Sequence, residues 1–329
     1  METILQEFVI ALIKIVILFA FLMFNAAYLT WVERKVIGHM QVRLGPMRTG
    51  PHGLLQPIAD GIKMFFKEDI IPANADKPVF YLAPIIPIIT VPCAFAVMPM
   101  PFLGKTVYTI ADLNIGILYI LALSSLGAYG TVLAGWASNS KYSLLGGLRG
   151  SAQIISYEVA LGLSLVGPIM MAGSANLGDI VNAQARSACF IFYQPVGFVI
   201  FLLAAIAETN RTPFDMPEAE SELVAGFATE YSGFRYALFF IGEYIGLIMM
   251  AALGTICFLG GWSGIELFDF VPPVIRFLFK MYLLIFLFIW LRATLPRVRF
   301  DQLMNFGWRI LIPVALANIV VTTLIKGIL

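Results

Sequence analysis

Long uninterrupted apolar stretches constrain this chain more than any other feature of its sequence. Each is about 20 residues long, the length that an α-helix needs to cross a hydrocarbon core of about 30 Å. Hydrophobic residues make up 60% of the 329 residues and charged residues only 12%, whereas soluble globular chains carry about 45–50% apolar and about 25% charged residues. The sequence therefore predicts an all-α polytopic membrane protein and excludes a soluble single-domain enzyme.

Apolar runs bounded by charge, proline or glycine predict eight transmembrane helices in one domain that covers residues 1–329. The spans are expected at about 8–32, 79–101, 115–137, 154–172, 188–207, 237–259, 274–294 and 308–326. The loops on one side are expected at 33–78, 138–153, 208–236 and 295–307. These loops, with the helix ends that flank the last one, hold 15 of the 21 Lys and Arg residues. By the positive-inside rule they face the cytoplasm, which places both termini outside.

Two further patterns bear on the architecture. Between the first two spans, apolar residues recur at helical spacing, which predicts an amphipathic helix in the membrane interface. They are Leu54, Leu55, Ile58, Ile62, Phe65 and Phe66. Such a helix would shape an entrance for a lipid-soluble molecule. No repeat with broken helices in matching positions is evident, which disfavours a stand-alone transporter built from inverted repeats.

The sequence shows no pattern for a redox centre or a nucleotide. Its three cysteines, Cys93, Cys189 and Cys257, are far apart and form no C-x-x-C pair for zinc or an iron–sulfur cluster. Both histidines, His39 and His52, fall in one polar loop, so they cannot face each other across a bundle as haem ligands. Neither a Walker loop nor a G-x-G-x-x-G fingerprint occurs, and the net charge of +1 gives no reason to expect nucleic acid.

Three carboxylates fall within or at the ends of predicted spans. Glu158 lies just inside the fourth span, Glu208 ends the fifth, and Glu243 lies about two turns into the sixth. A charge at the bilayer centre costs about 2.5–3.5 kcal/mol on lenient scales, so it needs a partner, a water-filled cavity or a function. Each residue alone is also compatible with an interfacial carboxylate. If the three helices pack together, these carboxylates form a buried acidic chain.

The loop after the fifth span, ETNRTPFDMPEAESELVAGFATEY at 208–231, is acidic and stiffened by prolines. Beyond Glu208, it sets five carboxylates against the single Arg211: Asp215, Glu218, Glu220, Glu222 and Glu230. A solvated acidic loop is the simpler interpretation of the charge, but interleaved apolar residues such as Phe214 and Phe227 indicate burial. Carboxylates held together in a partly desolvated place cannot all ionise, so at least one is expected to exchange protons near neutral pH.

Basic residues at two helix ends have alternative interpretations. Arg34 and Lys35 follow Glu33 at the end of the first span, where snorkelling cations are ordinary. A second basic cluster consists of Arg292, Arg297 and Arg299. It is either plain positive-inside signal or a docking surface for a cytoplasmic protein, and charge alone does not separate the two.

Five polar motifs in the predicted cytoplasmic loops and helix ends resemble one known family. They are ERKVIGHMQVRLGP at 33–46, GLLQPIADGIKMFFKED at 53–69, GWASNSKYSLLGGLRGSAQIISYE at 135–158, ETNRTPFDMPEAESELVAGFATEY at 208–231 and RATLPRVRFDQLM at 292–304. Along nearly its whole length, the chain resembles a membrane subunit of proton-pumping NADH:quinone oxidoreductase, respiratory complex I, namely the one called subunit 1 in mitochondria.

The resemblance implies a subunit that joins the redox arm to the membrane arm and forms most of the chamber through which quinone enters. It implies that Glu33, Arg34 and Asp60 line or adjoin the quinone passage, and that Arg211 and the acidic loop lie near the chamber. A chain of carboxylates would lead from that loop into the membrane. Its members here are Asp215, Glu218, Glu220 and Glu222 of the loop, and Glu208, Glu158 and Glu243 of the spans.

The implied cofactor is quinone as substrate, with ubiquinone ahead of menaquinone, while FMN and the iron–sulfur clusters belong to other subunits. No catalytic residue and no metal ligand is assigned here. The expected partners are the peripheral quinone-site subunits, the membrane-arm subunits and the lipid bilayer. A bacterial plasma (inner) membrane is expected, with the mitochondrial inner membrane as the alternative. The competing interpretation is the homologous subunit of a membrane-bound hydrogenase or another donor-linked complex.

Overall fold

The computed structural model describes residues 2–101, 107–218, 220–263 and 270–328. Almost all of the regular structure is helical, and the described strands are a two-residue pair, β1 (Met100–Pro101) and β2 (Val107–Tyr108), joined antiparallel. The α-helices are α1 (Glu2–Met40), α2 (Gln56–Phe66), α3 (Lys77–Leu82), α4 (Ile85–Ala94), α5 (Gly116–Ala137), α6 (Lys141–Ala172), α7 (Leu177–Arg186), α8 (Phe190–Tyr193), α9 (Pro195–Glu208), α10 (Glu220–Leu223), α11 (Gly233–Phe258), α12 (Pro273–Thr294), α13 (Phe300–Phe306) and α14 (Ile312–Ile328). Short 3₁₀ helices lie at Pro51–Gly53 (η1), Phe95–Val97 (η2) and Gly226–Ala228 (η3), and a π-helix lies at Gly307–Leu311 (η5).

Seven helical segments within the described residues are long and apolar enough to cross a membrane. They are Val9–Met40, Lys77–Val97, Gly116–Ala137, Lys141–Ala172, Gly233–Phe258, Pro273–Thr294 and Phe300–Gly327. The chain is therefore an all-α, multi-pass membrane protein, as its composition predicted. The amphipathic helix expected after the first span is also present as α2, with Ile58 51% and Phe66 80% exposed.

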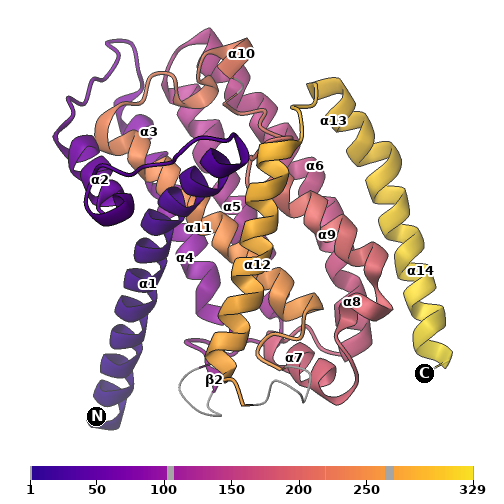
Figure 1. Cartoon of the computed structure of the whole chain (residues 1–329). Helices are drawn as coiled ribbons and strands as arrows, with labels where there is room; N and C mark the ends of the chain where they lie inside the picture. The colour runs from indigo at the N-terminus through magenta and orange to yellow at the C-terminus, as the bar shows by residue number, and fades with distance from the viewer. Residues whose placement is uncertain (1, 102–106, 219, 264–269, 329) are drawn as a thin grey trace.

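The predicted span at 188–207 is not one continuous helix. The chain leaves helical geometry at Gln194 (φ −134°, ψ 55°), and Pro195 then starts the 14-residue α9 after the single turn of α8. A proline at the first helical position cannot extend the preceding helix because it lacks an N–H and clashes with the turn before it. Figure 1 shows α8 and α9 following one another, and both chain termini at the lower end of the molecule.

Helix replaces much of the predicted loops 138–153 and 295–307. α6 already begins at Lys141, so most of the expected loop 138–153 continues the fourth span as a 32-residue helix. Its charge and glycines lowered the apolar signal, but glycine also permits close packing. A side chain on Gly147 would lie 3.3 Å from the Cα atom of Gly135 in α5. The expected loop 295–307 likewise contains α13.

α11 lies at the centre of the bundle. Its second half, from Leu247 to Phe258, is buried on every side, and the helix packs against α1, α2, α4, α9 and α12. In Figure 1 the polar loops, α2, α3, α10 and α13 gather at the upper end, opposite the termini. The N-terminal end of α11 therefore lies near the polar segments that sequence analysis singled out.

Candidate functional site

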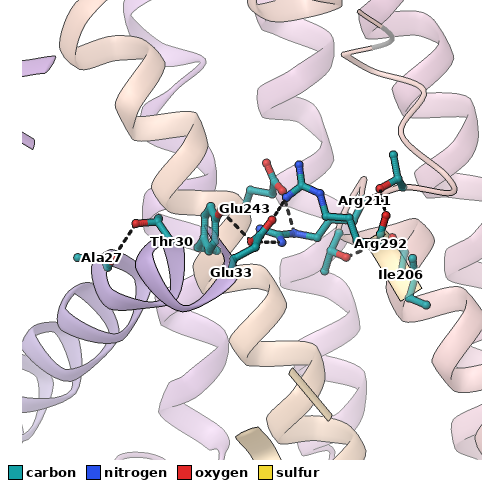
Figure 2. A network of polar contacts seen from close by, with 10 residues as sticks. Ala27, Thr30, Glu33, Ile206, Arg211, Glu243 and Arg292 are labelled. Atoms are coloured by element: carbon teal, nitrogen blue, oxygen red, sulfur yellow. Dashed lines mark hydrogen bonds and ion pairs between the residues drawn. The ribbon is translucent and has the colours of Figure 1, made fainter. Parts of the chain in front are cut away.

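A buried charge network joins four segments that are far apart in sequence. Arg211 Nη1 donates to Oε2 of Glu33 over 2.6 Å, and its Nε lies 3.0 Å from Oε1 of Glu243. Arg292 from the end of α12 donates to Glu33 Oε1, and the Tyr244 hydroxyl donates to Glu33 Oε2 over 2.9 Å. Figure 2 shows the side chains of Glu33, Arg211, Glu243 and Arg292 converging on one another.

The network compensates charge that would otherwise be costly to bury. The Arg211 side chain is 2% exposed and that of Glu33 is 5% exposed, and buried charges persist in proteins when they are paired and hydrogen-bonded. The Arg211 guanidinium also lies 4.4 Å from the ring centre of Tyr244, within cation–π range. Two arginines thus face two carboxylates, Glu33 and Glu243.

A cavity of about 110 Å³ lies next to this network, between α4, α5, α9, α11 and the acidic loop. Glu208, Glu218 and Glu243 line it. We call it the acidic cavity. Its remaining wall is largely apolar and includes Phe227, whose ring packs edge-on against Phe239 at 5.2 Å. The structure therefore brings three of the predicted carboxylates around one space.

Glu158 joins this group through α5. Ser125 of α5 donates a hydrogen bond to Glu158, and the neighbouring Ser124 lines the acidic cavity together with Glu208. Glu158 also acts electrostatically on Glu208. Helices α6, α9 and α11 thus bring their carboxylates together from one end of the bundle.

A second cavity, of about 360 Å³, lies between α1, α2 and α11, and we call it the α2 cavity. Arg34 and Asp60 line it and form an ion pair of 2.6 Å. Most other lining residues are apolar or aromatic, which suits a ring compound with a few polar atoms. Tyr236 and Phe240 of α11 line both cavities, so they form the wall between them.

The first half of the acidic loop is built like a protein core. Nε2 of the buried Gln153 donates to the carbonyls of Ala207 and Phe214, each over 2.7 Å. The ring of Phe214 packs on Tyr157 with centres 5.6 Å apart, and Asp215 is partly buried beside it. This segment is not the solvated loop that charge alone would suggest.

Glu222 points to a different environment from the other predicted carboxylates. Its side chain is 45% exposed, and it accepts a hydrogen bond of 2.5 Å from Arg149 of α6 while lying 3.9 Å from Arg297. The hydrogen bond from Arg149 and the charge of Arg297 hold the pKa of Glu222 below its ordinary value. The structure does not bring Glu222 to the acidic cavity. The side chain of Glu220 lies outside the described part of the chain.

Sequence reasoning overlooked two members of the site. Tyr244, which binds Glu33, gave no signal beyond its place next to Glu243 in an apolar run. Arg292 was assigned to a surface cluster, although it binds Glu33 while Arg297 lies near Glu222. Only the three-dimensional arrangement separates these two arginines.

Comparison with known proteins agrees with this architecture. A sequence profile of the family described as NADH dehydrogenase matches residues 13–323. The chain belongs to the NADH dehydrogenase family. Among similar members of that family, the second NADH-quinone oxidoreductase H-subunit of Geobacter metallireducens is 51% identical, with 98% of this chain and 96% of the relative covered. The NADH-quinone oxidoreductase H-subunit of Bacillus cytotoxicus is 51% identical over 95% of this chain and 93% of the relative. The resemblance drawn from the five motifs is confirmed.

Proposed function

We propose that the chain is the membrane subunit of a proton-translocating NADH:quinone oxidoreductase that forms the quinone-access chamber and couples quinone reduction to proton movement. The observation that carries the proposal is the pair of adjoining cavities. The α2 cavity is mainly apolar and contains Arg34 and Asp60, whereas the acidic cavity holds Glu208, Glu218 and Glu243. A change of charge on one side of their shared wall acts directly on carboxylates on the other side.

In this mechanism quinone enters from the bilayer beside α2 and passes Glu33, Arg34 and Asp60. Reduction or movement of the quinone changes the charge near Arg211, Phe214, Asp215 and Phe227 of the loop. The carboxylate chain, including Glu158 and Glu208, then takes up or passes on protons. Charges in a medium of low dielectric act strongly over short distances, which favours electrostatic coupling.

The surroundings of the chain follow from the same proposal. Quinone is the substrate, with ubiquinone ahead of menaquinone, and FMN and the iron–sulfur clusters are carried by other subunits. Peripheral quinone-site subunits dock on the cytoplasmic side, and membrane-arm subunits pack beside the bundle. The chain lies in a bacterial inner membrane with both termini outside. Figure 1 places the two termini at one end of the molecule, which supports their lying on the same side of the membrane.

The test compares Glu158→Gln and Glu208→Gln with Glu68→Gln, an exposed carboxylate of the loop after α2. Each variant is purified in mild detergent through a tag on this chain and checked for flavin and iron–sulfur content. Inhibitor-sensitive NADH:quinone reductase activity should fall strongly in the first two variants only. NADH oxidation by an artificial acceptor on the peripheral arm should stay unchanged in all three.

Two outcomes would contradict the proposal. Full coupled activity in correctly assembled Glu158→Gln and Glu208→Gln would refute the role of the carboxylates. If the unaltered chain co-purifies with no NADH:quinone activity at all, the chain serves a different electron donor.

A further inference from the structure

A lysine inside the membrane bundle remains unexplained by the proposed function. Lys280 lies in the second turn of α12, in a segment long and apolar enough to cross the membrane. Figure 1 shows the first turns of α12 at the same end of the molecule as α7 and the chain termini. The Lys280 side chain is partly buried. An ionised group in such a place needs compensation. The acidic cavity and the charge network lie at the opposite end of α11, so they do not provide it.

The compensation comes from backbone carbonyls. Nζ of Lys280 donates to the carbonyl oxygens of Leu259 over 2.6 Å, Gly261 over 3.1 Å and Ser263 over 2.6 Å. A lysine ammonium has three donors, so these three bonds saturate it. The accepting residues alternate along the chain, while the intervening Gly260 carbonyl accepts from the Ser263 hydroxyl instead.

The backbone turn that aims these carbonyls depends on glycine. Gly260 (φ +77°) and Gly261 (φ +55°) adopt left-handed conformations that other residues rarely adopt. A Cβ atom on Gly261 would lie 2.8 Å from Cγ2 of Val181, and one on Gly260 would lie 2.9 Å from Oγ of Ser263. Neither position has room for a side chain without a shift.

We call the segment 259–263, whose carbonyls surround the Lys280 ammonium, the cage. This segment also closes the C-terminal end of α11. Leu259 caps α11, and the last carbonyls of a helix carry the negative end of its dipole and have no partner within the helix. Among the described residues, the hydrogen bonds of the Lys280 ammonium go to these three backbone carbonyls, while Arg276, one turn earlier in α12, acts on it as a like charge. We propose that residues 259–263 form a binding site for a compact monovalent cation of the ammonium class, which the chain fills with its own Lys280 to hold α11 to α12.

The test removes the ammonium from the full chain, purified in mild detergent, and supplies the cation from solution. Lys280→Met should lower the midpoint of thermal unfolding by several degrees, whereas Lys141→Met, at an exposed lysine that starts α6, should not. Ammonium or methylammonium chloride should restore a large part of the loss relative to tetramethylammonium chloride at equal ionic strength. Equal midpoints in these salts would overturn the proposal.

Two further variants address the geometry and keep the test informative if Lys280→Met fails to fold. Lys280→Arg keeps the charge, but its planar fork cannot direct three donors to one converging set of carbonyls. It should therefore remain less stable than the parent chain, and full stability would show that charge alone suffices. Gly261→Ala distorts the cage itself, so its loss and that of Lys280→Arg should combine to less than their sum, whereas strict additivity would contradict a shared site.

Discussion

Removing Arg211 should destabilise the protein more than removing any exposed arginine. Arg211→Met deletes the guanidinium that lies 2.6 Å from Glu33 and 3.0 Å from Glu243. Both carboxylates then remain in a largely desolvated place, with Arg292, 37% exposed, as the remaining cation on Glu33. Breaking a buried ion pair by removing one partner costs about 3–5 kcal/mol, and the residual contact of Arg292 places the expected loss near the lower end.

The chain supplies its own control. Arg34 and Asp60 form an ion pair of the same length, but their side chains are 49% and 31% exposed. A solvent-screened pair contributes about 0–1 kcal/mol, so Arg34→Met should change the free energy of unfolding by no more than that. The assay is a titration of the full chain from mild detergent into SDS, followed by far-UV circular dichroism.

A second variant separates the lost attraction from the stranded charge. Adding Glu33→Gln to Arg211→Met removes one uncompensated carboxylate, so the double variant should be more stable than Arg211→Met alone. The reasoning is refuted if Arg211→Met and Arg34→Met lower the free energy of unfolding equally, or if Glu33→Gln makes the Arg211→Met chain still weaker.

Three other predictions follow from local geometry. Gly226→Ala should loosen the acidic loop, because a Cβ atom there would lie 1.6 Å from the Pro217 carbonyl oxygen, whereas Gly61→Ala, with no atom within 4 Å, should be neutral in the same SDS titration. Since Arg149 holds the pKa of Glu222 below its ordinary value of 4.5, their ion pair should persist from neutral pH to about that value and break only as the pH falls through the lowered pKa. Hydrogen exchange at 220–224, compared at each pH with that of Glu222→Gln, would detect the difference disappearing in acid. Thr322→Val removes the acceptor of the 2.8 Å bond from Gln194 and should cost about 0.6–1.7 kcal/mol in the SDS titration.

The membrane architecture could be predicted because long apolar runs have few alternatives in a bilayer. The amphipathic pattern of 54–66 likewise fixed α2 closely. The sequence was less informative where composition and structure diverge. The segment 141–153 combines charge and glycine like a loop, yet it is helical because small residues let α6 approach α5. The break at Gln194 had a visible signal in Pro195, which an apolar run on both sides concealed.

The sequence predicted most of the charged residues of the candidate site, but not which of them pair with one another. Glu158, Glu208 and Glu243 approach one another because their helices carry them at the same end, which follows from alternating spans. The pairing of Glu33 with Arg211 joins residues 178 positions apart, and no local pattern encodes it. Glu218 and Glu222 are four residues apart, but Glu218 lines the acidic cavity, whereas Glu222 lies near the partly buried Arg149 and Arg297.

This division within the acidic loop bears on how any coupling must operate. Residues 208–217 are fixed to the bundle by the hydrogen bonds of Gln153 and the ion pairs of Arg211, both buried. The Glu222 side chain is instead held to α6 by a partly exposed ion pair with Arg149, and the loop is buried again at Phe227 and Tyr231. Breaking the buried polar contacts of Arg211 costs far more than breaking the solvent-screened pair of Glu222 and Arg149. A charge change in the α2 cavity would therefore reach Glu243 through the fixed Arg211 network as an electrostatic signal, without displacement of this part of the loop.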